Sequence, residues 1–208
     1  MKNHTELLNH IAAKIGAVTY VEIGVFNPDH NFNKIKVPTK FGVDPDPNAR
    51  ATFKGTSDEF FKNLKAVHGR VDLYWIDGLH YWEQVRRDIE NAWECLTEGG
   101  VIALHDTNPP TEATTCIPRG RQREWCGDTY KAICALSYPG PGPYFFTANM
   151  DYGCTIIRKP FGQMWQSGQS VAFADIPEVA WSNFNDDRAT WINLLPVTQA
   201  LEFIDAWT

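Results

Sequence analysis

Four short apolar runs of this chain end in residues whose side chains could do chemistry. At or just after their ends they carry Glu22, Gly24, Asp44, Asp77, His105 and Asp106. Glycine lets a backbone approach a ligand closely, and a carboxylate about 20 residues farther on commonly binds ribose hydroxyls. Taken alone, the segment from Glu22 to Gly24 is typical of a strand that ends in a turn. Together with Asp44 and Asp77 at successive strand ends, it predicts a nucleoside-binding site.

A second group, Asp77, His80, His105 and Asp106, combines two imidazoles with two carboxylates. An imidazole, with an ordinary pKa of about 6.5, suits a general base that takes a proton from a hydroxyl group. The competing interpretations are structural. Asp77 suits the cap of a helix that begins near Tyr81, and His80 then has no chemical role.

Periodic apolar patterns indicate the elements that must position these residues. Short β-branched and aromatic runs predict strands at 18–24, 41–44, 71–77 and 101–106, and helical spacing predicts helices at 7–15, 56–67 and 81–96. Strands that alternate with helices favour an α/β fold with a parallel sheet and helices on both faces. Ligands of such open sheets bind outside the carboxyl ends of the strands, where the residues above lie.

The second half of the chain is less regular. A loop after Asp106 carries Arg119, Arg121 and Arg123 and precedes a helix near 128–136, and the runs 143–147 and 154–158 flank a turn and predict an antiparallel hairpin. We predict one domain at 1–160, and at 161–208 a tail rich in tryptophan that packs on the same domain. The glycine pair at 99–100 is expected to end the helix predicted at 81–96.

Composition excludes several classes of protein. The 208 residues have a formal net charge of -6, which disfavours a partner as anionic as duplex nucleic acid. No apolar run approaches the roughly 20 residues that cross a bilayer, and the polar start lacks the apolar core of a secretory signal, so we expect a cytoplasmic protein. The five cysteines form no C-x-x-C pair, which argues against a disulfide framework or a zinc ribbon.

The sequence resembles the class I S-adenosylmethionine-dependent methyltransferases over about residues 15–160, in particular their small-molecule and sugar-type O-methyltransferase branch. The motifs that carry the resemblance are VEIGV at 21–25, GVDP at 42–45, TSD at 56–58, WIDGLH at 75–80 and LTEGGVIALHD at 96–106. The resemblance implies a Rossmann-like, doubly wound, mostly parallel sheet of seven strands with a C-terminal antiparallel hairpin.

The resemblance also implies roles for individual residues in binding the methyl donor. Glu22 and Gly24 correspond to residues near its amino-acid part, Asp44 to the ligand of the ribose hydroxyls, and Ser57 and Asp58 to residues that face the adenine. The loop that begins at Asn27 departs from the family pattern because it lacks the further glycine. Asn27 is assigned to the donor site, where backbone N–H groups before a short helix near residue 32 suit the methionine carboxylate.

In metal-dependent relatives, the acid after the fourth strand and the polar pair after the fifth hold a divalent cation. The matching residues here are Asp77, His105 and Asp106, with Asp77 shared with the donor site. A histidine ligand favours manganese, iron or zinc over magnesium. The arginines of the loop suit an acidic acceptor, although a solvated loop explains them as well, and the tryptophans suit either a sugar-like or aromatic acceptor or core packing.

The leading hypothesis is therefore transfer of a methyl group from S-adenosylmethionine to a hydroxyl of a small-molecule or sugar-like acceptor. The catalytic residues of this hypothesis are His80, His105 and Asp106. One alternative is a module that binds a nucleoside without catalysis. The other is an NAD-dependent oxidoreductase, which the missing G-x-G-x-x-G glycines disfavour. The sequence leaves the oligomeric state open.

Overall fold

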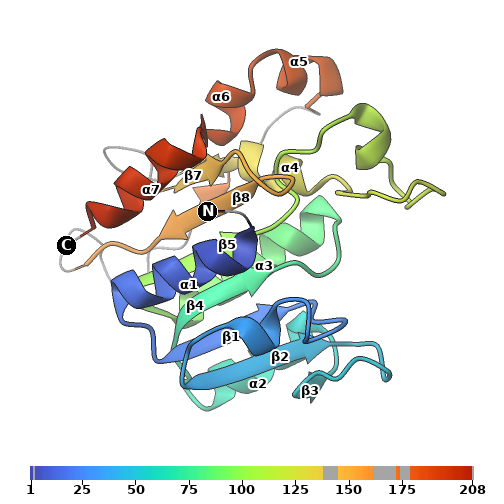
Figure 1. The fold of residues 1–208 in the computed structure, drawn as a ribbon. Coiled ribbons are helices and arrows are strands. Elements are labelled where there is room, and N and C mark those ends of the chain that lie inside the picture. Colours follow the sequence, from blue (N-terminus) through green and yellow to red (C-terminus); the bar gives the residue numbers. More distant parts are fainter. Residues whose placement is uncertain (2, 138–144, 162–171, 174–178, 208) are drawn as a thin grey trace.

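The computed structural model describes residues 1, 3–137, 145–161, 172–173 and 179–207. They form a central sheet in the order β10-β7-β8-β5-β4-β1-β2-β3, with helices on both faces (Figure 1). Its strands are β1 Thr19–Ile23, β2 Thr39–Asp44, β3 Phe53–Lys54, β4 Val71–Ile76, β5 Leu96–Leu104, β7 Phe145–Ala148, β8 Cys154–Arg158 and β10 Leu194–Leu195. Two further short strands, β6 Leu136–Ser137 and β9 Ala172–Phe173, pair with each other.

The direction of the strands confirms the predicted α/β class. Strand β8 runs antiparallel to both of its neighbours, β5 and β7, and the other neighbouring strands of the sheet are parallel. Strand β1 lies between β2 and β4, so the chain winds outward from β1 in both directions. This arrangement creates a switch point at the carboxyl ends of β1 and β4, the place where open α/β sheets bind ligands.

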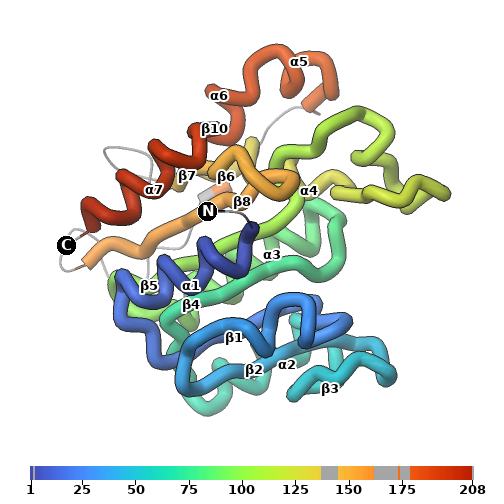
Figure 2. Tube along the Cα trace, viewed as in Figure 1, coloured from blue at the N-terminus to red at the C-terminus, as the bar shows by residue number. Residues whose placement is uncertain are grey.

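The helices form one layer on each face of the sheet. On one face, α1 His4–Ile15 and α7 Val197–Asp205 lie side by side (Figure 2). The other face is covered by α2 Ser57–Ala66, α3 Trp82–Cys95, α4 Thr129–Cys134, α5 Trp181–Asp186 and α6 Arg188–Ile192. Two short 3-10 helices, η1 Phe32–Lys34 and η2 Glu112–Thr115, lie in loops. Each layer buries its own apolar cluster against the sheet, which makes the sheet a rigid platform for the residues at its edge.

One boundary differs from the sequence prediction. Helix α3 ends at Cys95, and Leu96 already pairs with Val71 in the sheet, so the glycines at 99–100 do not end the helix. They lie inside β5, where the pairing with β4 shifts between Leu96 and Val101. Gly99 has a φ of 73° there, a conformation that glycine adopts readily. It accommodates a bulge, in which β5 has more residues than β4 between two paired positions.

The C-terminal segment adds to the same sheet. Strand β10 pairs with β7, and Ala200 and Ile204 of α7 are fully buried in the cluster that contains the buried face of α1. The sequence patterns did not mark the two-residue strands β3 and β10. Trp165 and the start of the predicted hairpin at 143–144 lie outside the described residues. Among the helices that the structure describes, none is long and apolar enough to span a membrane.

Candidate active site

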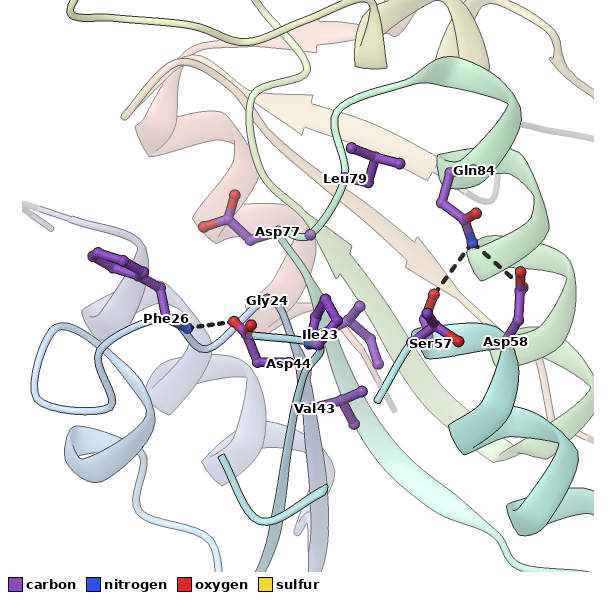
Figure 3. A pocket seen from close by; sticks show the side chains of 13 residues that line it. Ile23, Gly24, Phe26, Val43, Asp44, Ser57, Asp58, Asp77, Leu79 and Gln84 are labelled. Atoms are coloured by element: carbon purple, nitrogen blue, oxygen red, sulfur yellow. Dashed lines mark hydrogen bonds between the residues drawn. The ribbon is translucent and has the colours of Figure 1, made fainter. Parts of the chain in front are cut away.

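A cavity of about 410 Å³ opens at the carboxyl ends of β1, β2 and β4 (Figure 3). We call it the first cavity. Its lining combines strand ends with the start of two helices: Ile23, Gly24, Phe26, Val43, Asp44, Pro45, Thr56, Ser57, Asp58, Asp77, Gly78, Leu79 and Gln84. It therefore contains five of the seven residues that the sequence predicts to bind the donor, and it lies at the switch point of the sheet.

Gly24 permits the close approach of the two strand ends that form the floor of the first cavity. Its φ is 87°, and a Cβ atom at this position would lie 2.1 Å from the carbonyl oxygen of Asp77. The N–H of Gly24 donates to the carbonyl of Val43 at 2.8 Å. Any side chain at position 24 would separate β1 from β4 and displace Asp77.

Asp44 is held at the end of β2 by the neighbouring loops. Its Oδ2 accepts a hydrogen bond from the N–H of Phe26 at 2.7 Å, and its Oδ1 accepts one from the N–H of Asp46 at 2.9 Å. Phe26 occupies the left-handed region with a φ of 45°, although its sequence position lacks the glycine that usually adopts it. The loop thus reproduces a glycine-type turn without glycine and orients the carboxylate.

The opposite wall of the first cavity comes from the starts of α2 and α3. Thr56 caps α2 in a capping box with Glu59, which places Ser57 and Asp58 in the first turn. Gln84 of α3 donates from Nε2 to Ser57 Oγ at 3.2 Å and to Asp58 Oδ1 at 3.4 Å (Figure 3). The sequence analysis missed Gln84, because a polar residue in the first turn of an amphipathic helix carries no signal of its own.

Two predicted donor residues lie elsewhere. Glu22 is buried on the α1 side of the sheet, where its Oε2 accepts hydrogen bonds from Tyr20 at 2.5 Å and from Asn31 at 2.8 Å. Burial raises the pKa of Glu22 to about 7, against the effect of these hydrogen bonds. The side-chain oxygen of Asn27 accepts from the N–H of Asp29 at 3.1 Å. Neither residue lines the first cavity, so the structure does not bring them to it.

Four residues beside the first cavity form what we call the His/Asp cluster: Asp77, His80, His105 and Asp106. His105 Nδ1 lies 3.4 Å from Asp77 Oδ1 and 3.6 Å from Asp106 Oδ2. His80 Nε2 lies 3.3 Å from Asp77 Oδ1, and His80 Nδ1 lies 3.4 Å from Asp106 Oδ2. The structure therefore joins the ends of β4 and β5, as parallel strands at one edge of the sheet predict.

The structure excludes the interpretation of Asp77 as the cap of the next helix. Helix α3 begins at Trp82, whose N–H donates to Asp128 Oδ1 at 2.8 Å, so Asp128 and not Asp77 satisfies the start of this helix. Asp106 has a φ of 57°, a conformation that is rare outside glycine and that clusters at functional sites.

Aromatic side chains hold both imidazoles in place. The ring of His80 stacks on Trp125 at 5.0 Å between centroids, and its Nδ1 lies 3.2 Å from the Trp125 carbonyl oxygen. The ring of His105 lies 5.3 Å from that of Trp75, which is buried in β4. These rings restrict where each imidazole can point.

The charges of the cluster support one another. Burial acts to raise the pKa of Asp77, but His105 and His80 outweigh it and hold that pKa well below its ordinary value. Burial acts to lower the pKa of both histidines, but Asp77 raises both, so each lies above its ordinary value. Burial raises the pKa of Asp106 despite the nearby His105. The residues alone thus favour protonated imidazoles that neutralise buried carboxylates.

A second cavity of about 380 Å³ opens on the other side of the His/Asp cluster. It is lined by His105, Asp106, Arg123, Glu124, Trp125, Cys126 and Tyr152. Of the three arginines in the preceding loop, Arg123 lines this second cavity, Arg119 lies 5.5 Å from the ring of Trp125, and Arg121 is exposed. Asp77 lines the first cavity and contacts His105, which lines the second. The two cavities therefore meet at the cluster.

Part of this geometry lies in a segment that matches a known family. A family model described as a methyltransferase domain matches residues 21–107, from β1 to the end of β5 and the two polar residues beyond it. No curated protein matches the chain. The matched residues 21–107 contain the floor of the first cavity and all four members of the His/Asp cluster.

Solved structures share the fold at low sequence identity. An O-methyltransferase from Bacillus cereus in complex with SAH has 12% identity and a TM-score of 0.51, covering 75% of this chain and 80% of that one. A putative O-methyltransferase from Klebsiella pneumoniae has 14% identity and a TM-score of 0.54, covering 77% of this chain and 81% of that one. A putative caffeoyl-CoA O-methyltransferase from Staphylococcus aureus has 14% identity and a TM-score of 0.52, covering 75% of this chain and 82% of that one. Residues 21–107 thus match a methyltransferase domain, and the chain shares its fold with these solved O-methyltransferases.

Proposed function

We propose that the enzyme transfers the methyl group of S-adenosylmethionine to a hydroxyl of a small-molecule acceptor. The observation that carries this proposal is the place of Asp77, which lines the first cavity and contacts the imidazole of His105 in the wall of the second. Methyl transfer needs a donor and a nucleophile in line across a short gap, so most of the rate comes from positioning. Two cavities that meet at one carboxylate suit this requirement.

The donor is assigned to the first cavity. Asp44 is the acceptor for the ribose hydroxyls, because its carboxylate closes β2 and is oriented by loop amides. Ser57, Asp58 and Gln84 face the adenine side, and the floor at Gly24 leaves room for the amino-acid part. The carboxylate of Asp77 lies where a sulfonium cation would be attracted.

The acceptor is assigned to the second cavity. Trp125 and Tyr152 offer ring faces and edges for a sugar or an aromatic ring, and the guanidinium of Arg123 suits an acidic group on it. His105 and Asp106 line this cavity and His80 does not, so an acceptor hydroxyl would meet His105 and Asp106 first. In the absence of a cation, we assign proton removal to Asp106 and to the deprotonated imidazole of His105, and a supporting role to His80.

The cluster offers ligand atoms for a divalent cation, and those of Asp77, His80 and Asp106 all lie within 4.8 Å of one another. Donor atoms about 2.1 Å from a tetrahedral metal lie about 3.4 Å apart, and His105 Nδ1 is 3.4 Å from Asp77 Oδ1 and 3.6 Å from Asp106 Oδ2. We propose that Asp77, His105 and Asp106 would hold the cation, and a ligand set with an imidazole favours manganese, iron or zinc. When bound, such a cation would polarise the acceptor oxygen as a Lewis acid.

Calorimetry followed by turnover tests this proposal. S-adenosylmethionine and S-adenosylhomocysteine are titrated into the protein beside NAD, and release of S-adenosylhomocysteine is then measured against a panel of hydroxylated aromatic acids and sugar acids. We expect the two S-adenosyl compounds to bind, NAD to produce no heat, and at least one acceptor class to be methylated. Binding without turnover of any acceptor would favour a non-catalytic module, and binding of NAD instead would favour an oxidoreductase.

A further inference from the structure

The start of α1 reaches the His/Asp cluster from the opposite end of the chain. The ring of His4 stacks on Trp75 at 5.1 Å between centroids and meets the ring of His105 edge-on at 5.1 Å. Figure 2 shows the N-terminus of the chain above the sheet beside β8. The rings of His4, Trp75 and His105 therefore pack against one another.

Asp151 lies between these two histidines. Its Oδ2 contacts His4 Nδ1 directly and also accepts from the backbone N–H of His4 at 3.3 Å. Its Oδ1 lies 3.8 Å from His105 Nε2, a charge contact rather than a hydrogen bond. His105 Nε2 is buried and has no hydrogen-bond partner among the residues that the structure describes. The carboxylate of Asp151 is therefore the group that faces this otherwise unsatisfied nitrogen.

The turn that carries Asp151 is fixed to the loop after the cluster. The N–H of Asn108 donates to the carbonyl of Tyr152 at 2.7 Å, and the N–H of Thr107 donates to the carbonyl of Gly153 at 3.3 Å. Gly153 has a φ of 91°, and a Cβ atom there would lie 2.4 Å from the N–H nitrogen of Asn108. This close approach fixes Asp151 relative to the segment that carries His105.

We propose that His4 and Asp151 are positioning residues that fix the imidazole of His105, with Nε2 toward Asp151 and Nδ1 toward Asp77 and Asp106. A histidine that binds a metal or accepts a proton through one ring nitrogen commonly donates from the other to a carboxylate, which sets the tautomer and the ring orientation. Here the charge of Asp151 favours the proton on Nε2, and His4 holds Asp151 in place. A cation held in the cluster would take the place of the proton on Nδ1 and leave the one on Nε2.

This inference deepens the proposed function, because it rests on a role for His105 in the acceptor half of the site. The direct contact between His4 and Asp151 leaves no space for an ion between those two atoms. This contact favours a clamp over a second metal site formed by His4, Asp151 and His105, whose ligand atoms also lie near one another.

The test compares three variants with the full-length protein. Asp151→Ala removes the carboxylate. His4→Phe keeps a ring on Trp75 but cannot pair with Asp151, so it separates the clamp from simple packing. His10→Ala is the matched control, because His10 lies on the same helix and pairs with Asp205 at the surface. The readouts are Co²⁺ affinity with its absorption spectrum, and the ¹H–¹⁵N NMR cross-peak of the His105 Nε2–H, assigned with His105→Gln.

We expect Asp151→Ala and His4→Phe to bind Co²⁺ about 10- to 100-fold more weakly than the wild type. Both should lose the Nε2–H cross-peak through faster exchange with solvent, while His10→Ala matches the wild type in both readouts. The proposal is overturned if both variants keep the cross-peak, or if the wild type shows none. It is also overturned by two Co²⁺ ions per chain, one of them lost in His4→Phe, since His4 would then be a ligand.

The two proposals fail separately. If the wild type binds no Co²⁺, the proposed metal is wrong, and the cross-peak alone decides whether His4 and Asp151 position His105. If the wild type binds Co²⁺ with an intact cross-peak in every variant, the metal stands and the clamp is wrong.

Discussion

The first cavity is lined by one stretch of chain, residues 23–84, whereas the His/Asp cluster and its supports draw on five segments between His4 and Asp151. The first cavity is shaped largely by backbone: a glycine at a strand crossing, amides that orient Asp44, and the first turn of α2. The cluster is shaped by side chains that hold one another through charge and ring contacts. A site of the first kind can be recognised in local sequence, and one of the second kind requires the tertiary fold.

The two regions should also differ in how far the effect of a substitution extends to neighbouring residues. Side chains of the cluster are between 9% and 27% exposed and share partners, so the loss of one leaves the others with unpaired charge. In the first cavity, Asp44 instead accepts its hydrogen bonds from two backbone N–H groups, which a side-chain substitution elsewhere leaves in place. We therefore expect large, coupled effects in the cluster and smaller, independent effects in the first cavity.

The largest expected effect is that of removing the cation. Excess chelator should abolish turnover, because Asp77, His105 and Asp106 would hold the metal on the acceptor side. Affinity for S-adenosylmethionine should stay within about twofold, since Asp44, Ser57 and Asp58 lie in the other cavity. Turnover is measured with and without chelator, and readdition of Mn²⁺ or Zn²⁺ serves as the control. Full activity in chelator would leave His105 and Asp106 as acid–base groups alone.

The next effect separates catalysis from donor binding. His105→Ala should lower the methyl-transfer rate about 100- to 10,000-fold, the usual cost of a lost acid–base group, with donor affinity unchanged. The loss of a metal ligand would lower the rate in the same direction. His80→Ala should cost less, because His80 does not line the second cavity. Single-turnover rates and calorimetry on each variant give the comparison, with His10→Ala as control. Equal losses in both variants would contradict the assignment of His105 to the acceptor.

A third prediction concerns Glu22, which ends up outside the first cavity. Because burial raises its pKa from 4.5 to about 7, the native state binds this proton more tightly than the unfolded chain does. Its contribution to stability is therefore complete below about pH 4.5 and falls as pH rises to 7, by about 3 kcal/mol. Glu22→Gln should relieve this penalty, so that its free energy of unfolding exceeds that of the wild type at pH 8 and approaches it near pH 4.5.

Urea unfolding at the two pH values measures this difference, and calorimetry with S-adenosylmethionine accompanies it. Donor affinity should be unchanged in Glu22→Gln. A loss of donor affinity without a gain in stability at pH 8 would return Glu22 to the donor site, where the sequence prediction had it.

The smallest effect is expected in the first cavity itself. Asp44→Ala should weaken binding of S-adenosylmethionine by about 1 to 3 kcal/mol, because a charged acceptor for two ribose hydroxyls is lost. Asp205→Ala is the matched control, since Asp205 lies at the end of α7 with a side chain that is 61% exposed. Unchanged donor affinity in Asp44→Ala would refute the ribose assignment and with it the local character of this cavity.

Much of the fold and part of the site follow from the sequence. Apolar periodicity located β1, β2, β4, α1, α2 and the hairpin of β7 and β8, because these elements are set by local alternation of buried and exposed positions. The motif around Gly24 and the acids at 44 and 77 marked the first cavity, since glycine and strand-end carboxylates have local conformational causes. The start of β5 was predicted at residue 101 and lies at Leu96, because the glycines at 99–100 belong to the strand and do not separate it from α3.

Only the tertiary structure decided which polar residues meet. In it, Glu22 contacts Tyr20 on the α1 face of the sheet, and Gln84 lines the first cavity. Asp128 accepts the hydrogen bond from the first N–H of α3. Above all it placed His4 and Asp151, which are 147 positions apart, against each other beside His105. Local sequence carries no record of such contacts, because they arise when the start of α1 packs over the sheet next to the turn before β8.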